Sequence, residues 1–390
     1  MIEVIDEHQD APLIWAPLPP TPAQAPQLAR FALHVDDLSL TLRAWRALAK
    51  DCALLLPQAA PYPGLLASPL RSLSPLHPLH ALLPQGLAQA WMKCDDELPF
   101  SQSLSDRGMC LAVLSLVSDA MLAAGLCHVG QPLRDLAAPD TQAWLSQHRL
   151  MIYGPGRDAL AAARLCAALG LPAHVLLRGE TPTALREALL DSGAEVIEAA
   201  SATTVAAVKR AATGPTNPTW WLDTTESFEA FQGAACAALE LKQQLFSHHI
   251  QPGPQHTVLV YLAASNCLAA AALARGLKCV FGQGVQIVLV EDSQQLQALP
   301  TLCRWPQDSE HAAPSPGSHM GRVALTGMVD SLITVDHRHR QRARLPLPEP
   351  LQAQLSEEAL NLFAAAASHF GTLRQVPAQV VFWMSDCALA

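Results

Sequence analysis

Residues 150–177 decide the fold of this chain, and they read LMIYGPGRDALAAARLCAALGLPAHVLL. An apolar run of strand length, 150–153, is followed by a turn that contains glycine and proline, a helical pattern over 157–169 and a second apolar run, 173–177. Two short strands joined by a helix form a βαβ unit, whose strands are parallel because the helix carries the chain back across the sheet. The stretch therefore predicts a parallel sheet covered by helices.

The same alternation continues toward the C-terminus. Further predicted strands share a short, mostly apolar run between helical segments, at 194–197, 219–222, 258–262 and 285–290. Further predicted helices lie between them, at 181–190, in a segment that ends near Val208, and in a segment that ends near Val280. The pattern predicts an α/β protein of two lobes, each a mostly parallel β-sheet flanked by helices.

The first hundred residues differ from the rest because they are rich in proline. Proline limits long helices, so we expect an irregular region wrapped on a core, with a helical pattern over 28–55 and a loop-like zone over 57–84. The predicted division is an N-terminal region of residues 1–100 packed on the large lobe, a small lobe of residues 101–220, and a large lobe of residues 221–390 that part of the N-terminal region completes.

Charge and cysteine usage exclude several classes of function. The net charge of −9 and the pI near 5.9 argue against a general nucleic-acid-binding protein. The ten cysteines form no C-x-x-C pair and no zinc spacing, which is typical of free thiols in a reducing compartment. The acidic N-terminus lacks the basic start and the apolar run of a signal peptide, so a cytoplasmic location is expected.

One apolar stretch, residues 257–274, approaches the length of a membrane span. Ser265 and Asn266 interrupt it, and a buried strand followed by a helix accounts for the pattern better. We therefore expect no membrane segment in this chain.

A second motif links the chain to a known family. Residues 98–108 read LPFSQSLSDRG and resemble the L-P-x-S-x-S-x-K-x-R-G signature of bacterial D-serine dehydratase. That family uses pyridoxal phosphate (PLP) and has the two-lobed tryptophan-synthase-β-like architecture, PLP fold type II. The resemblance implies that the signature lysine, which forms an imine with the cofactor aldehyde, corresponds to Ser105. A hydroxyl forms no imine, so the covalent chemistry of the family has no starting point here.

The resemblance extends from about Met92 to the C-terminus. Met92-Lys93-Cys94-Asp95 is similar to the strand that leads into the family's lysine motif, and residues 192–196, SGAEV, carry the spacing of a later strand. What the chain shares with the family is mostly scaffold, which implies the family's fold.

The turn after the first strand of residues 150–177 is similar to the loop that holds the cofactor ring. In the family, the asparagine of a G-S-T-G-N loop donates a hydrogen bond to the phenolic oxygen of the ring. The corresponding residues here are Gly154-Pro155-Gly156-Arg157-Asp158, so Asp158 takes the asparagine's place. The resemblance implies that a carboxylate faces an anionic phenolate, which it repels.

The family's glycine-rich phosphate loop corresponds to residues 264–272, ASNCLAAAA. Glycines let backbone N–H groups converge on a phosphate, and none is present in this segment. Alanine and leucine favour helix, so we expect a helix that begins around Cys267 and is capped by Ser265 or Asn266. Because a helix N-terminus attracts anions, a small anionic ligand is expected to bind weakly near Ser265.

Met384 is the fourth altered position. The family has a threonine beside the pyridine nitrogen in an A-T-G-G-G segment, and the corresponding residues here are 383–387, WMSDC. A thioether makes no such hydrogen bond. Because four distant contacts have changed, no PLP cofactor is expected. We expect a catalytically inactive D-serine-dehydratase-like protein, a pseudoenzyme with a binding or regulatory role and an unidentified protein partner.

Two alternatives keep the chain an enzyme. In the first, Lys93 supplies a displaced imine lysine for a PLP-dependent D-serine ammonia-lyase; against it, a lysine at a strand end is expected to hold its ammonium group in solvent. In the second, PLP-independent or metal-assisted chemistry uses polar residues of the old cleft, namely Ser105, Asp158, Cys267, Asp386 and Cys387. A water-filled polar cavity accounts for the same residues without a metal.

Overall fold

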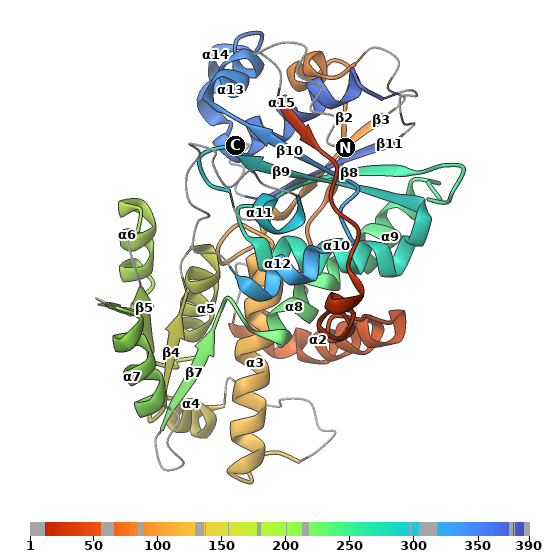
Figure 1. Ribbon diagram of the computed structural model, residues 1–390. Helices are drawn as coiled ribbons and strands as arrows, with labels where there is room; N and C mark the ends of the chain where they lie inside the picture. The colour runs from red at the N-terminus through yellow and green to blue at the C-terminus, as the bar shows by residue number, and fades with distance from the viewer. Residues whose placement is uncertain are drawn as a thin grey trace. The chain divides into compact units, whose positions relative to one another are not determined.

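Figure 1 shows the computed structural model of the chain. It describes residues 12–55, 66–84, 87, 89–128, 136, 138–154, 156–177, 181–199, 201–212, 218–296, 298–303, 318–373, 377 and 379–385, with the backbone alone at 46–55, 202 and 354. Two compact units make up the chain. Unit 1 consists of Met1–Val35, Ser68–Glu97 and Ala237–Ala390, and unit 2 consists of Asp36–Ala67 and Leu98–Cys236.

Unit 1 is built on a seven-stranded sheet in the order β1-β10-β9-β8-β11-β3-β2. The inner strands are parallel to one another, and the edge strands β1 and β2 are antiparallel to their neighbours. The strands are β1 (Leu13–Trp15), β2 (Leu70–Leu73), β3 (Gln89–Cys94), β8 (Val258–Ala263), β9 (Val285–Asp292), β10 (Ser331–Val335) and β11 (Gln379–Met384). The inner strands read as continuous apolar runs because helices cover both of their faces.

Helices cover the two faces of this sheet in different ways (Figure 1). On one face, α15 (Glu357–Phe370) packs on β8, β9 and β10 and is joined by α13 (His337–Arg344). On the other face, α10 (Cys267–Phe281) packs on β9 and contacts both α9 (Ala237–Ser247) and α12 (His319–Leu325). The remaining short elements of unit 1 are η1 (Pro22–Gln24), α1 (Ala25–Ala29), η3 (Pro78–Leu82), η4 (Asp95–Glu97), η5 (Gly282–Gly284), α11 (Leu299–Leu302) and α14 (Glu349–Gln354).

Unit 2 contains a four-stranded, fully parallel sheet in the order β6-β5-β4-β7. Its strands are β4 (Arg149–Tyr153), β5 (Ala173–Leu177), β6 (Glu195–Glu198) and β7 (Thr219–Asp223). Its helices are α2 (Val35–Leu55), α3 (Ser105–Ala123), α4 (Pro139–Leu145), α5 (Arg157–Ala168), α6 (Thr183–Asp191), α7 (Ala202–Ala212) and α8 (Phe228–Ala235). The first βαβ unit is therefore β4-α5-β5, as residues 150–177 predict.

Two glycines let α3 and α8 pack closely in unit 2. A Cβ atom on Gly108 would lie 2.6 Å from the carbonyl oxygen of Ala230, and one on Gly233 would lie 2.5 Å from the carbonyl oxygen of Arg107. Because backbone occupies that space, any larger side chain at either position has to push the helices apart.

The strands and helices predicted from residue 150 onward are confirmed, with small differences at their ends. Two predictions for the N-terminal region are wrong. The helical pattern over 28–55 spans the end of α1 and a separate α2 that begins at Val35, and the zone over 57–84 contains β2 and η3. Proline did not prevent the latter, because Pro78 is the first residue of η3, where no N–H group is needed.

The grouping of residues 36–67 also differs from the predicted division. The sequence assigns this segment to an N-terminal region on the large lobe, whereas it belongs to unit 2. α2 explains the difference, since Leu38 and Trp45 are buried and the thiol of Cys236 in the same unit donates a hydrogen bond to the Leu38 carbonyl (3.5 Å). Burial of one helix face decided the grouping.

Residues 257–274 form β8 and the first half of α10, as predicted. Across the parts of the chain that are described, no helix combines the length and the apolar character needed to cross a membrane.

Candidate functional site

Ser105 is the first residue of α3, in unit 2. Its side chain is 3% exposed, and its backbone N–H donates to the hydroxyl of Ser103 (3.3 Å). The loop before it is fixed by Asp106, whose carboxylate accepts the N–H groups of Phe100 and Ser101, each at 2.7 Å. The position that corresponds to the family lysine is therefore a buried hydroxyl at a rigid loop-to-helix junction.

The loop between β4 and α5 provides the second part of the site. Gly154 has φ +145°, and a Cβ atom on it would lie 1.9 Å from the Thr224 hydroxyl oxygen, so only glycine fits. Gly156 caps α5 with φ +82°, and Asp158 follows in the first turn with 7% exposure. Pro155 lies outside the described residues.

Within unit 2, the starts of α3 and α5 lie side by side. The guanidinium of Arg157 donates to the carbonyl of Ser101 (2.5 Å), and Arg164 donates to the carbonyl of Phe100. Ser105 and Asp158, predicted from two motifs about fifty positions apart in the sequence, are thus held at neighbouring helix ends.

In unit 1, the segment that corresponds to the phosphate loop forms the start of α10. The predicted helix is confirmed, and Asn266 is its N-cap, since its side-chain oxygen accepts the N–H of Ala269 (3.2 Å). Ser265 makes a different contact: its hydroxyl donates to Oε2 of Glu358 at 2.7 Å. A carboxylate from α15 therefore lies beside the helix N-terminus at which an anion was expected.

Cys267 is the first residue of α10 and is 2% exposed. Burial raises the pKa of its thiol, Glu291 adds to the rise and Arg322 opposes it. A protonated, buried thiol is neither a nucleophile nor a metal ligand. Among the described residues, no group of three or more His, Cys, Asp or Glu side chains is arranged to hold a metal ion; Asp386 and Cys387 lie outside them.

Met384 is the last residue of β11 and is fully buried. It belongs to the apolar core on the α15 side of the sheet, with Cys94 and Tyr261. β11 pairs in parallel with β8, Phe382 opposite Tyr261, so both strands end at the same edge of the sheet. The structure thus brings Met384 to the edge where the β8–α10 connection begins, as an apolar core residue.

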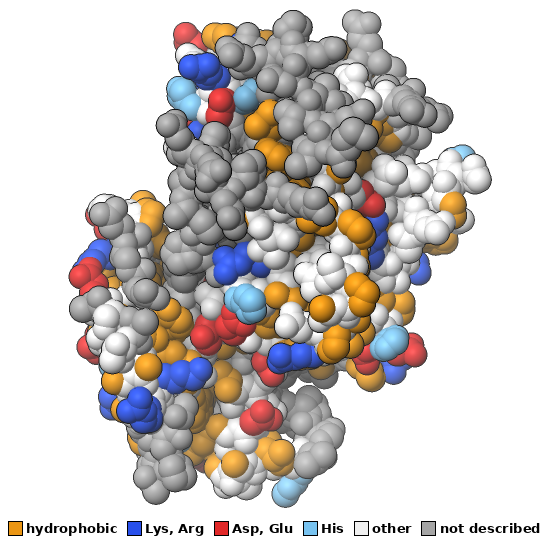
Figure 2. Space-filling model, in the orientation of Figure 1, with side chains coloured by type: hydrophobic (Ala, Val, Ile, Leu, Met, Phe, Trp, Pro, Cys, Tyr) orange, Lys and Arg blue, Asp and Glu red, His pale blue; other side chains and the backbone are white. Residues whose placement is uncertain are grey.

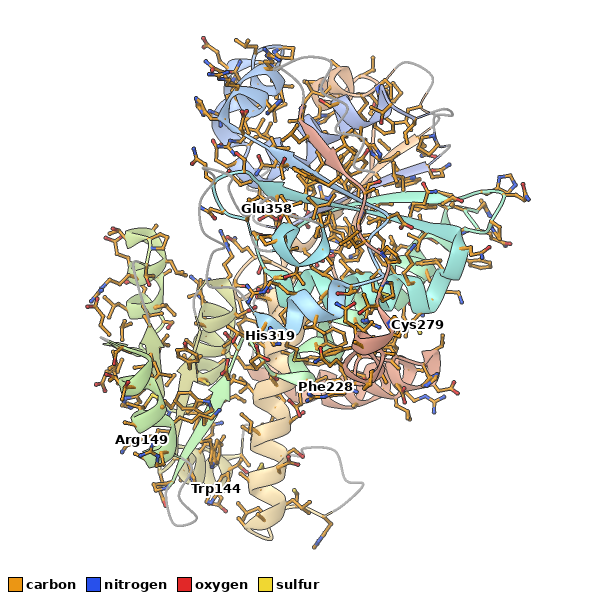
Figure 3. The ribbon with its side chains drawn as sticks, in the orientation of Figure 1. Trp144, Arg149, Phe228, Cys279, His319 and Glu358 are labelled. Carbon is orange, nitrogen blue, oxygen red and sulfur yellow. The ribbon has the colours of Figure 1, made fainter. Side chains whose placement is uncertain are left out.

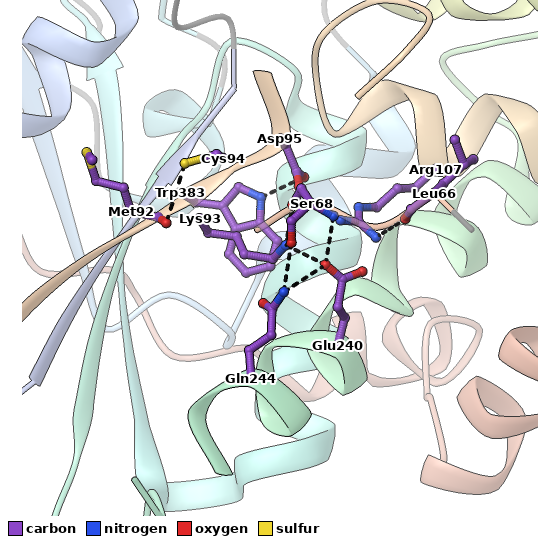
Figure 4. A network of polar contacts seen from close by, with 10 residues as sticks. All are labelled: Leu66, Ser68, Met92, Lys93, Cys94, Asp95, Arg107, Glu240, Gln244 and Trp383. Atoms are coloured by element: carbon purple, nitrogen blue, oxygen red, sulfur yellow. Dashed lines mark hydrogen bonds and ion pairs between the residues drawn. The ribbon is translucent and has the colours of Figure 1, made fainter. Parts of the chain in front are cut away.

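Lys93 departs from the prediction. A strand-end lysine was expected to hold its ammonium group in solvent, but the side chain is fully buried (Figure 4). Its Nζ donates to Oε1 of Glu240 at 2.5 Å, to the Ser68 carbonyl at 2.6 Å and to the Ser68 hydroxyl. The expectation is wrong because β3 is an inner strand, and α9 supplies a carboxylate over the place where Lys93 emerges.

A wider network completes the surroundings of this lysine (Figure 4). Oδ1 of Asp95, 3.8 Å from Nζ, accepts the Ser68 hydroxyl, and Oδ2 accepts the indole N–H of Trp383 at 2.8 Å. The amide of Gln244 donates to the Ser68 carbonyl at 2.7 Å. Sequence reasoning did not identify Glu240 and Gln244; their i, i+4 spacing on one helix face was the available signal.

Comparison with known proteins identifies the scaffold. The family described as "Pyridoxal-phosphate dependent enzyme" matches residues 67–342. This chain belongs to that family. Several solved structures of PLP enzymes share its fold: a threonine deaminase from T.th. has a TM-score of 0.60 at 19% identity, with 92% of this chain and 99% of that chain covered. Maize serine racemase has a TM-score of 0.59 at 16% identity, with 92% and 94% covered. The fold is thus PLP fold type II.

Curated relatives are named as probable D-serine dehydratases. The one from Burkholderia thailandensis is 28% identical over 375 residues, which cover 92% of this chain and 82% of that protein. One from Pseudomonas putida is 29% identical over 286 residues, which cover 70% of this chain and 63% of that protein. The chain therefore spans less than two thirds of the length of some of its curated relatives.

The residues of this family member do not fit PLP. Ser105 offers no amine, and Met384 offers an apolar thioether inside a core. At α10, the Glu358 carboxylate hydrogen-bonds to Ser265 where a phosphate dianion would need positive charge. Ser105, Gly154 and Asp158 lie in unit 2, and Ser265, Asn266, Cys267 and Met384 in unit 1, so their convergence in one cleft stays a prediction.

Proposed function

We propose that this member of the PLP-dependent enzyme family is catalytically inactive, a pseudoenzyme related to D-serine dehydratase that works by binding or regulating a partner protein. The environment of Ser105 carries the proposal. A buried hydroxyl occupies the position that corresponds to the imine lysine, and the neighbouring loop is held by Asp106. Without an amine at that position, the reaction of the named relatives has no first bond to form.

The other two ends of the cofactor would meet unsuitable groups as well. The Glu358 carboxylate at Ser265 repels a phosphate, and Asp158 repels a phenolate. Core packing and site chemistry make separate demands on a sequence, so a fold can be kept after its reaction is lost. The complete βα framework beside these groups supports that history.

The main alternative is a PLP-dependent D-serine ammonia-lyase in which Lys93 has replaced the family lysine. An imine-forming lysine needs a neutral amine that can reach the aldehyde. Lys93 instead has no solvent exposure and donates hydrogen bonds to Glu240 and Ser68. A carboxylate at 2.5 Å favours the charged ammonium form, so the geometry speaks against this alternative.

PLP-independent chemistry in the old cleft has one observation in its favour, the adjacent starts of α3 and α5. Ser105 and Asp158 are both almost fully buried, however, and the thiol of Cys267 is held in its protonated form. A nucleophile needs access to substrate and a base beside it. We therefore rank this alternative behind the pseudoenzyme.

The proposal includes a protein partner in the cytoplasm and no role on nucleic acid or membranes. The eight described cysteines are free, which supports a reducing compartment. On the face drawn in Figure 2, basic and acidic side chains are interspersed with hydrophobic ones, unlike the basic stripe of a nucleic-acid-binding protein.

An absorbance titration of the purified chain with PLP, followed by borohydride reduction and mass spectrometry, tests the proposal. We expect no aldimine band and no reduced adduct on any of the five lysines. The Burkholderia thailandensis relative, treated identically, is the positive control. An adduct on one named lysine, together with release of ammonia from D-serine, would overturn the proposal. A regulatory role additionally requires a partner whose activity changes when the chain is added.

A further inference from the structure

The N-terminus of α10 combines a helix dipole with side chains of both charges. α10 has 15 residues, and the N–H groups of its first turn have no partner within the helix. Their aligned dipoles attract anions. The side chain of Asn266 caps one of these groups, the N–H of Ala269.

A carboxylate of the chain itself is found at this helix end. Glu358 lies in the first turn of α15 and is labelled in Figure 3. Its Oε2 accepts the hydroxyl of Ser265 at 2.7 Å, one residue before the N-cap. Ser356 caps α15 independently, so Glu358 is not required as the cap of its own helix.

A second, independent observation is a cation beside the same turn. α12 crosses α10 so closely that a Cβ atom on Gly321 would lie 2.7 Å from the N of Leu268. The next residue, Arg322, lies near enough to Cys267 to lower the pKa of its thiol. Among the described residues, Arg322 makes no side-chain hydrogen bond and no ion pair. Its guanidinium is therefore available to an anion at the start of α10.

The buried acid nearest to this turn is already engaged. Glu291 is 3% exposed and accepts the N–H groups of Ala298 (2.5 Å) and Leu299 (3.0 Å), which begin α11. Glu358 is half-buried and held by a surface hydroxyl, so it is the more easily displaced of the two carboxylates.

We propose that Ser265, the first turn of α10 and Arg322 form an oxyanion site that Glu358 keeps closed. An anion of the phosphate class binds there only when the Glu358 carboxylate is removed or neutralised. Backbone N–H groups, a hydroxyl and a guanidinium together suit a tetrahedral, doubly charged oxyanion. The inference rests on the proposed function and deepens it, because it names the residue that excludes an anion from the site and the anion class that the site would take.

Calorimetric titration of the full-length chain with inorganic phosphate tests the proposal. The proteins are the wild type, Glu358→Gln, Glu358→Ala and the control Glu349→Gln, which removes an exposed carboxylate of the same unit at the start of α14. We expect both Glu358 variants to bind phosphate at least about tenfold more tightly than the wild type, because the repulsion between two anions is removed. Glu349→Gln should match the wild type.

Second substitutions locate the binding. Glu358→Gln combined with Ser265→Ala or with Arg322→Met should lose most of the gained affinity, since each removes one donor to the anion. Phosphate should raise the thermal midpoint of Glu358→Gln and leave that of the wild type unchanged. The isosteric glutamine keeps the measurement possible if the alanine variant does not fold. Equal phosphate affinity in the wild type and Glu358→Gln would overturn the proposal.

Comparison of anions separates this proposal from the proposed function. Glu358→Gln should bind PLP and inorganic phosphate similarly and pyridoxal not at all, with no borohydride-stable adduct. Phosphate binding that is unchanged by Glu358→Gln, in a wild type that forms no adduct, contradicts only the oxyanion site. An adduct in the wild type contradicts only the pseudoenzyme.

Discussion

The ammonium group of Lys93 lies 2.5 Å from a carboxylate oxygen of Glu240, and the lysine side chain has no exposure to solvent. The pair joins an inner strand, β3, to α9 on one face of the unit 1 sheet. Asp95 lies 3.8 Å from the same nitrogen, so one buried cation faces two carboxylates. This arrangement explains why a lysine at a strand end is a structural residue in this chain.

Lys93→Met is expected to lower the free energy of unfolding of the chain by about 3–5 kcal/mol, because removing one partner leaves buried carboxylates without their counter-charge. Urea denaturation followed by circular dichroism measures the change. Lys278→Met is the matched control, since its pair with Asp330 at 2.7 Å is partly exposed and should cost no more than about 1 kcal/mol. Equal losses for the two variants would show that burial of Lys93 has no energetic consequence.

Ser105→Lys is expected to restore neither PLP binding nor ammonia release from D-serine. The new amine would meet an unchanged Asp158, Glu358 and Met384, none of which suits the cofactor. Burying a lysine at a position 3% exposed should also lower the free energy of unfolding by about 1–3 kcal/mol. Absorbance scans with PLP and a coupled ammonia assay measure the outcome, with Ser105→Ala as the control. Full turnover from this one change would refute the account of the other three positions.

A buried tyrosine–histidine pair predicts a pH dependence of stability. The hydroxyl of Tyr261 lies 3.0 Å from Nδ1 of His369; burial raises the pKa of the tyrosine, which keeps its proton and donates it, and lowers the pKa of the histidine from 6.5. The unfolded chain therefore takes up a proton at this histidine at a higher pH than the folded chain does. The stabilisation is complete above about pH 6.5 and is lost as the pH falls toward the folded-state pKa.

The double variant Tyr261→Phe with His369→Phe removes this titration while both rings stay in the core. The free energy of unfolding should fall less steeply for it than for the wild type between about pH 6.5 and 5, by up to about 1.4 kcal/mol per pH unit for one proton. Urea denaturation at several pH values gives both slopes. Identical slopes would mean that His369 titrates alike in the folded and unfolded chains.

Gly108→Ala is expected to destabilise unit 2 by about 1–3 kcal/mol, because its Cβ atom would overlap the Ala230 carbonyl at the α3–α8 crossing. Gly253→Ala is the control, since nothing lies within 4 Å of a Cβ atom at that position. Thermal unfolding distinguishes the two variants. A neutral Gly108→Ala would show that the two helices separate without cost.

The sequence predicted the framework well and the polar interior poorly. The runs 150–153 and 173–177 were found as β4 and β5 because apolar strands between turn residues are a local pattern. The cap of α10 was found within one residue for the same reason. The partners of Lys93 and Ser265 were missed, since Glu240 and Glu358 lie 147 and 93 positions away along the chain. No local pattern encodes such distances.

By itself, the sequence determined the βα order, the parallel sheets and the absence of an amine at Ser105, because these depend on residue type and spacing over short stretches. Only the tertiary structure decided that Lys93 is buried, that α2 belongs to unit 2 and that Glu358 lies at the start of α10. Those facts depend on which surfaces are removed from water and on which charges then have to be paired. Both are settled by packing between distant segments.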